Sequence, residues 1–308
     1  MVKCLECGRD VRRIGSRHVE RCSGITLDEY HRRHPKPSPP CLSPEQLIEP
    51  AISYMYGFLL ADGHLRDGSG QKGSLCISIA ARDRYILEQF QSLVPCYSSI
   101  REATRSTNFV VDYESVAWQV SNLGFRNLLK LWGMPSGRKK SIVQAPMMPF
   151  STVDFYRGFI DGDGSVGFTG AGLPFVSLVI VSDALLDGYL AFLKNITGKE
   201  RSVMRSKRDN VYNVMVMRED ACLLVNALYY KGCLALPRKM DMADAIRKWC
   251  RPIDMKIKPK GRPWTDADNA YVLEHSLSES MIKLGRTFNA VNIRRHKLRR
   301  MMNDGGVV

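Results

Sequence analysis

Two consecutive stretches of the chain, each about 100 residues long, repeat the same succession of apolar and polar positions. Each begins with a largely apolar run that ends in Asp-Gly, continues with strand-like runs, and then shows a helical run that opens with aspartate. The apolar runs are residues 56–63 (YGFLLADG) and 157–164 (RGFIDGDG), the strand-like runs include residues 75–80, 117–121, 175–181 and 211–217, and the helical runs open at Asp83 and Asp183.

This repeat predicts an α+β fold with two pseudo-symmetric halves, each in the order αββαββα. We expect half 1 over residues 44–149 and half 2 over residues 150–250. Prolines before Ser43 predict a stiff linker over residues 38–43, and the capping-box pattern at Ser43 predicts that a helical turn opens half 1. A basic linker is expected over residues 251–262.

The two apolar runs carry one carboxylate each at matched positions, Asp62 and Asp163. Small residues four positions apart give each predicted helix a face that allows close backbone packing. These small residues are Gly57 and Ala61 in the first run and Gly158 and Gly162 in the second. Such packing would bring both carboxylates together at the helix ends, where they repel unless a cation lies between them. An aspartate before glycine also commonly ends a helix, but its repetition favours a paired Mg²⁺ site.

Residues 1–37 carry a cluster of cysteine and histidine. Cys4 and Cys7 form a C-x2-C knuckle, and His18 and Cys22 follow with three residues between them. Four such ligands suit tetrahedral Zn²⁺, which would supply much of the folding free energy of so short a segment. The other histidines and cysteines that could replace His18 or Cys22 are His31, His34 and Cys41.

Residues 263–303 predict a module of three short helices with a basic last helix. Thr265, Ser278 and Thr287 are candidate N-caps, and Gly285 is expected to end the second helix. Three short helices with this charge pattern suggest a helix-turn-helix that binds DNA through the last helix, although a basic helix that docks on the core has the same pattern. The basic side chains expected to contact DNA are Arg294, Arg295 and Lys297.

Charge and composition limit the classes of partner and the compartment that we expect for this protein. The net charge is +14, and residues 1–37 and 251–308 are the most basic stretches. This favours double-stranded DNA over an anionic membrane surface, which is the alternative. No apolar run is long enough to span a membrane, no secretory signal is recognisable, and the nine scattered cysteines suit a reducing compartment. We therefore expect a cytoplasmic protein.

The two motifs MYGFLLADG and YRGFIDGDG resemble those of single-chain LAGLIDADG homing endonucleases, over about residues 44–250. The first motif departs from the family at Leu60, where the family usually has a structural aspartate. The resemblance implies a monomer with internal pseudo-two-fold symmetry whose sheets form a saddle over the DNA major groove. It implies that the carboxylates of Asp62 and Asp163 and the backbones of Ala61 and Gly162 bind Mg²⁺. It also implies that both aspartates and the side chains of Lys140 and Lys239 are the catalytic groups. Lys139 or Arg238 could take the place of these lysines.

Basic residues on the candidate strands are the expected DNA contacts of this saddle. Guanidinium groups can pair with guanine, and lysine or arginine can hold phosphate. These residues are Arg101, Arg105, Arg201, Arg205, Lys207 and Arg208. With its C-x2-C knuckle and the tail Gly24–Tyr30 (GITLDEY), the N-terminal segment also resembles the zinc module of bacterial MucR/Ros-type regulators, which implies a bacterial or phage origin. The C-terminal pattern WT-x-x-D…LGRT-x-x-A-V-x-x-R resembles a Myb/SANT-type helix-turn-helix.

The functional hypothesis is a site-specific, Mg²⁺-dependent DNA endonuclease that promotes mobility of its own gene or intron. A non-catalytic DNA-binding regulator on the same scaffold is one alternative, and an intron RNA maturase is the other. Retention of both Asp62 and Asp163 argues against the regulator.

Overall fold

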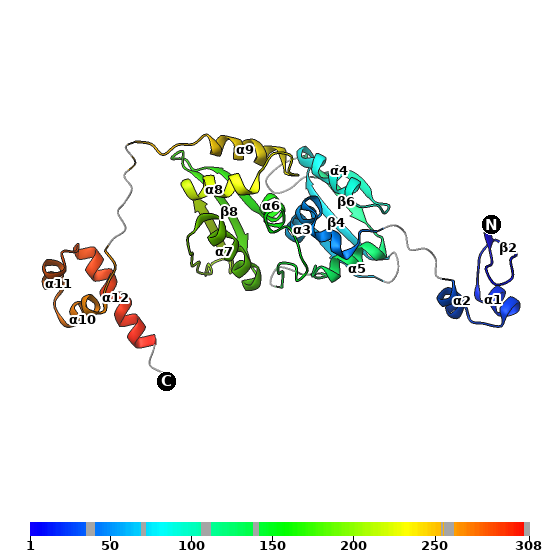
Figure 1. The fold of residues 1–308 in the computed structure, drawn as a ribbon, viewed down its shortest axis with the longest axis horizontal. Helices are drawn as coiled ribbons and strands as arrows, with labels where there is room; N and C mark the ends of the chain where they lie inside the picture. The colour runs from blue at the N-terminus through cyan, green and yellow to red at the C-terminus, as the bar shows by residue number, and fades with distance from the viewer. Residues whose placement is uncertain are drawn as a thin grey trace. The chain divides into compact units, whose positions relative to one another are not determined.

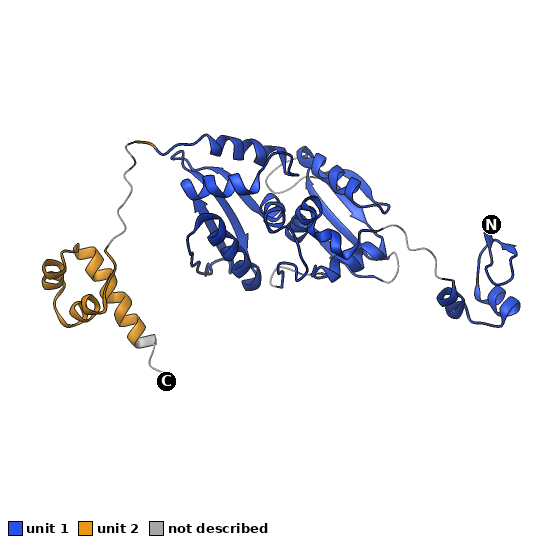
Figure 2. Cartoon of the chain, in the orientation of Figure 1, with its two compact units in different colours: residues 1–251 blue, residues 252–308 orange. Residues whose placement is uncertain are grey.

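The computed structural model describes residues 1–34, 41–68, 72–105, 112–137, 142–253, 255 and 262–304. The chain forms two compact units, residues 1–251 and 252–308, which Figure 2 colours separately. Helices and antiparallel sheets together make an α+β protein, as the repeat predicted. In the described part of the chain, no helix is long and apolar enough to cross a membrane.

Half 1 begins with the predicted capping box, in which Ser43 and Gln46 open a short 3₁₀ helix. A four-stranded antiparallel sheet in the order β3-β4-β6-β5 follows the first α-helix. Alternate residues of β4 point into the core, with Ile77 opposite Trp118 of β6. The elements are η1 (Pro44–Ile48), α3 (Pro50–Asp62), β3 (His64–Arg66), β4 (Ser74–Ala80), η3 (Ala81–Asp83), α4 (Arg84–Leu93), β5 (Ser99–Arg105), β6 (Tyr113–Val120) and α5 (Leu123–Leu131).

Half 2 repeats this arrangement with a three-stranded sheet in the order β7-β8-β9. The inward side chains of β8 occupy the positions of those of β4, since Val176, Leu178 and Ile180 follow Leu75, Ile77 and Ile79 by 101 residues. The elements are α6 (Thr152–Asp163), β7 (Gly164–Phe168), β8 (Pro174–Ile180), α7 (Asp183–Thr197), β9 (Tyr212–Met217), α8 (Glu219–Leu228) and α9 (Pro237–Arg247).

The second half departs from the predicted αββαββα order, because residues 199–211, which are all described, form no strand. Side-chain bonds hold this segment instead. Arg205 donates to the carbonyl oxygen of Val181 at 3.0 Å and to Asp183 at 2.7 Å, and Arg201 pairs with Asp220 at 2.8 Å. The expectation that Arg201, Arg205, Lys207 and Arg208 lie on strands was therefore wrong.

The helices α3 and α6 lie side by side between the two sheets (Figure 1). Their contact is reciprocal: a Cβ on Gly57 would collide with the carbonyl oxygen of Phe155, and a Cβ on Gly158 would collide with that of Tyr54. Residues 54 and 155, and residues 57 and 158, are both 101 positions apart, as in a pseudo-two-fold interface. Only glycine fits at either crossing position.

Two small modules precede and follow the core in the sequence. Residues 1–34 contain β1 (Val2–Lys3), β2 (Asp10–Val11), α1 (Ser16–Ser23) and α2 (Leu27–Arg33), with a separate apolar cluster of Cys4, Val19 and Tyr30. The second unit contains α10 (Asp266–Glu274), α11 (Leu277–Leu284) and α12 (Phe288–Asp304). Thr265 caps α10 as predicted, but Ser276 rather than Ser278 caps α11, because its side chain accepts the amide hydrogen of Glu279.

Replacing Gly57 by alanine tests the reciprocal helix contact. The added methyl group would push α3 away from α6, so we expect the free energy of unfolding to fall by about 1–3 kcal/mol. Gly170→Ala is the matched control, since a Cβ there meets no atom within 4 Å. Urea unfolding measures both variants, and equal stability of the two would contradict the contact.

Candidate functional site

The two motif carboxylates end adjacent helices and face a common hollow. Asp62 is the last residue of α3, Asp163 is the last residue of α6, and both are exposed. Both line a cavity of about 920 Å³, here called the central cavity. An ideal Cβ on Gly162 would overlap the methyl group of Ala61 and lie 3.5 Å from Oδ2 of Asp62. Close packing of α3 and α6 thus brings a carboxylate of one half to the helix end of the other.

Among the described residues, the wall of the central cavity includes one further ionisable group, His64 of β3. This histidine lies two residues after Asp62, and the matched position in half 2 is Ser165. The remaining wall is largely apolar, with Phe159 and Val179 among its residues. His64 was not predicted from the sequence, although it directly follows the Asp-Gly of the first motif.

Lys239 of α9 lies behind the end of α6 rather than on the wall of the central cavity. It is 4% exposed, and among the described residues that line the cavity it does not occur. Its Nζ donates to the carbonyl oxygens of Ile160, Asp161 and Gly164 at 2.6, 2.8 and 2.9 Å. An ammonium group has three hydrogens, so these bonds use all of them. Burial lowers the pKa of Lys239 to about 8, which the carboxylate of Asp161 opposes.

Asp161 is the buried acceptor of a network that joins the two halves. Its carboxylate accepts hydrogen bonds from the hydroxyl groups of Tyr54 (2.7 Å) and Tyr229 (2.8 Å) and from the amide of Leu236 (2.8 Å). Burial raises the pKa of Asp161, while the charge of Lys239 and these hydrogen bonds lower it. Tyr54 belongs to α3, so this network fixes α3 and the end of α6 together.

The equivalent positions of half 1 carry different chemistry. Leu60, 101 residues before Asp161, is buried in the apolar core. Tyr56 donates to the carbonyl oxygen of Trp132 at 2.9 Å, whereas Arg157 at the matched position pairs with Asp154 and donates to two carbonyl oxygens. Half 1 therefore supports its motif helix with apolar packing and a neutral hydrogen bond, whereas half 2 supports it with buried charged groups.

The other candidates for the basic catalytic side chains are Lys140, Lys139 and Arg238. Lys140 and Lys139 lie outside the described residues. Arg238, the alternative to Lys239, forms a two-pronged ion pair with Asp83 of half 1 at 3.1–3.2 Å. Arg238 therefore links the halves and does not line the central cavity, as far as the described residues go.

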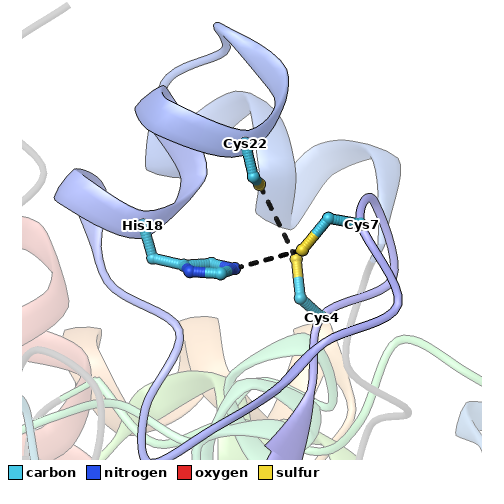
Figure 3. A group of neighbouring side chains, drawn as sticks. All are labelled: Cys4, Cys7, His18 and Cys22. Atoms are coloured by element: carbon cyan, nitrogen blue, oxygen red, sulfur yellow. Dashed lines mark hydrogen bonds between the residues drawn. The ribbon is translucent and has the colours of Figure 1, made fainter.

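The predicted metal-binding cluster of the N-terminal module forms in the structure. The ligand atoms of Cys4, Cys7, His18 and Cys22 all lie within 4.8 Å of one another (Figure 3). The knuckle between β1 and β2 presents the first two residues, and α1 presents the others. Burial raises the pKa of Cys4, but backbone hydrogen bonds from residues 6 and 7 and side-chain hydrogen bonds with His18 and Cys7 together lower it to about 6. The alternative His34 pairs instead with Glu6 at 2.6 Å.

Two of the basic side chains predicted to contact DNA hold the C-terminal module together. Arg294 donates to the side chain of Asn269 at 2.8 Å, and Arg295 donates to the carbonyl oxygen of Val272 at 2.7 Å. Both bonds fasten α12 to α10, whereas Lys297 is exposed. In half 1, Arg101 is exposed on β5, and Arg105 ends the same strand.

Two tyrosines of α3 test the charged network. Tyr54→Phe removes a hydrogen bond to a buried carboxylate and should lower the free energy of unfolding by about 1.5–3 kcal/mol. Tyr56→Phe removes one to a neutral carbonyl and should cost about 0.5–1.5 kcal/mol. Both variants are compared by urea unfolding. A larger loss for Tyr56→Phe would contradict the role given to Asp161.

Comparisons with known proteins give only distant structural similarity. No family model matches the chain, and no curated protein matches it. The homing endonuclease I-WcaI bound to its DNA recognition sequence is 14% identical, with 70% of this chain and 91% of that chain covered and a TM-score of 0.47. Meganuclease I-SmaMI bound to uncleavable DNA is 13% identical (66% and 90% covered, TM-score 0.42). Full-length DUF199/WhiA from Thermatoga maritima is 16% identical (87% and 95% covered, TM-score 0.40). These TM-scores are low, so no activity is carried over from them.

Proposed function

We propose that the protein is a site-specific, divalent-metal-dependent endonuclease of double-stranded DNA that promotes mobility of its own gene or intron. The observation that carries this proposal is the pair Asp62 and Asp163, which end two reciprocally packed helices on the wall of one cavity. The strongly basic composition supports a polyanionic substrate.

The chemistry of the central cavity fits a hard divalent cation. Carboxylates of Asp62 and Asp163 and backbone oxygens of Ala61 and Gly162 are the ligand type that Mg²⁺ prefers. The carbonyl ends of both helices add partial negative charge that favours a cation. When bound there, Mg²⁺ would lower the pKa of a water molecule and stabilise the leaving oxygen of a phosphodiester.

In this proposal Lys239 acts as a positioning residue. Its three hydrogen bonds end at carbonyl oxygens of the last turn of α6 and of Gly164, directly around Asp163. Holding this turn fixes the direction in which the Asp163 carboxylate points. Lys140 remains the candidate for the same position in half 1 and lies outside the described residues.

DNA contacts are proposed at side chains that stay exposed. Arg101 on β5 and Lys297 on α12 are exposed and suited to phosphate or base edges. Arg205 and Arg208 already pair with Asp183 and Asp209, so contact with DNA would compete with those ion pairs.

Zn²⁺ is the proposed structural metal of the N-terminal module. Tetrahedral zinc bonds of about 2.3 Å to sulfur and 2.0–2.1 Å to nitrogen require S–S edges of about 3.8 Å and S–N edges of about 3.5 Å. The Sγ atoms of Cys4 and Cys22 are 3.9 Å apart, and Sγ of Cys7 is 3.5 Å from Nε2 of His18. These two distances match the edges of a tetrahedral zinc site and support zinc as the metal.

Asp62→Asn and Asp163→Asn test the proposed activity. Each should lower cleavage of a randomised duplex library in Mg²⁺ by about 10³-fold or more, because one anionic ligand is lost, while DNA affinity stays within about threefold. Sequencing of cut ends measures cleavage. Asp187→Asn, at an exposed position of α7, is the matched control. Full cleavage by either site variant would contradict the two-acid site. DNA binding without cleavage by the unmodified protein would favour a non-catalytic regulator.

Lys239→Met tests the positioning role. We expect Mn²⁺ affinity of the full chain to fall about 10–100-fold, together with cleavage, as for other residues that orient metal ligands. Calorimetric titration measures the affinity, and circular dichroism checks folding. Lost cleavage with unchanged Mn²⁺ affinity would instead assign Lys239 a direct role in the reaction.

Cys22→Ser tests the zinc site. The variant should lose stoichiometric zinc, measured by elemental analysis, and amide hydrogens of residues 1–34 should exchange faster because the metal supports that fold. Acidification should release zinc from the unmodified protein, because protons compete with the metal for the cysteine thiolates. Cys41→Ser is the control and should keep its zinc. Zinc retained by Cys22→Ser would place the ligands elsewhere.

A further inference from the structure

Three arginines of the N-terminal module converge beside the metal ligands. Arg17 and Arg21 lie four residues apart on α1 and therefore share one helix face, and Arg9 follows the cysteine knuckle. Together with His18 and Cys22 they line a hollow of about 410 Å³. Two backbone hydrogen bonds hold the knuckle. The amide of Gly8 donates to the carbonyl oxygen of Cys4 at 2.8 Å, and the amide of Cys4 donates to the carbonyl oxygen of Arg9 at 2.9 Å.

Among the described residues, these arginines lack the acidic partner that Arg32 and Arg33 of the same module have. Arg32 and Arg33 of α2 both pair with Glu29, at 2.6 and 2.9 Å. Within the described residues, no carboxylate forms an ion pair with any of the three arginines that line the hollow. Like charges four residues apart on a helix repel, so this arrangement destabilises the module unless an anion lies in the hollow.

The metal cluster itself is too weak an anion to balance them. Three thiolates and a neutral histidine around Zn²⁺ carry one net negative charge, against three guanidinium groups. An additional anion of one or two charges would complete the balance. Guanidinium groups offer paired N–H donors that match the oxygens of a phosphate.

We propose that Arg9, Arg17 and Arg21 form a binding site for backbone phosphate of double-stranded DNA, directly over the metal ligands. The inference rests on DNA being the substrate under the proposed function. Phosphate contacts carry no base sequence information, so the module anchors the enzyme on DNA instead of selecting its target. Cys4 and Cys7 of the knuckle and His18 and Cys22 of α1 would hold zinc, which would keep Arg9 beside Arg17 and Arg21.

The test uses the full chain and a 40-base-pair duplex of arbitrary sequence, with fluorescence anisotropy read at several KCl concentrations. Arg17→Gln/Arg21→Gln should weaken binding about tenfold and lower the slope of log affinity against log salt by about 1.8, or about 0.9 for each lost phosphate contact. Arg32→Gln/Arg33→Gln removes the same charge from α2 and should change affinity less than about threefold. Zinc content should stay unchanged in both.

Equal losses in the two double variants would overturn the site, because net charge alone would explain them. Lost zinc with unchanged DNA affinity would also overturn it, since the arginines would then serve the thiolates. If Arg17→Gln/Arg21→Gln misfolds, Arg9→Gln alone, outside the helix, should lower the salt slope by about 0.9. Binding losses as expected in a protein that never cuts DNA would keep this site and contradict the endonuclease. Normal DNA cleavage with an unchanged salt slope would overturn this site and keep the proposed endonuclease.

Discussion

The close backbone contact between α3 and α6 is the constraint on which the core depends. At Gly57 and Gly158 each helix touches the carbonyl oxygen of the other, and no side chain fits between them. This contact sets the axis of pseudo-symmetry between the halves. It also determines that the two helices end together, so that Asp62 and Asp163 reach the same cavity. The sheets on either side follow from the same relation, since each half packs around its own motif helix (Figure 1).

The two halves share this contact but support it by different means. Half 2 surrounds the end of α6 with Asp161, Tyr229 and Lys239, a set of buried polar groups whose hydrogen bonds are well satisfied. Half 1 has Leu60 at the matched position and relies on apolar packing. Only half 1 contributes a histidine, His64, to the cavity wall. The carboxylates are thus equivalent in position while their surroundings are chemically unequal.

The features that sequence could predict are those encoded by local spacing. The repeat of about 100 residues predicted both halves, the glycines four apart from small residues predicted the helix contact, and the C-x2-C knuckle with His18 and Cys22 predicted the metal cluster. Features that depend on long-range packing could not be predicted. The partners of Asp161 lie 68 to 107 residues away, and no local pattern marks them. Residues 199–211 of half 2 form no fourth strand, and side-chain bonds such as the ion pair of Arg205 with Asp183 hold this segment. A periodic pattern in the sequence cannot reveal such bonds.

The same reason explains the basic residues. Charge along the chain predicts a polyanionic partner, but it cannot separate an arginine that faces solvent from one that fastens two helices, as Arg294 and Arg295 do. In the proposed function, packing of α3 on α6 makes one metal site from two carboxylates. Its most direct test is the anomalous scattering of Mn²⁺ in crystals of the full chain bound to DNA. We expect a Mn²⁺ peak in the central cavity within bonding distance, about 2.2 Å, of both Asp62 and Asp163. Manganese bound to neither carboxylate, or to one alone, would contradict it.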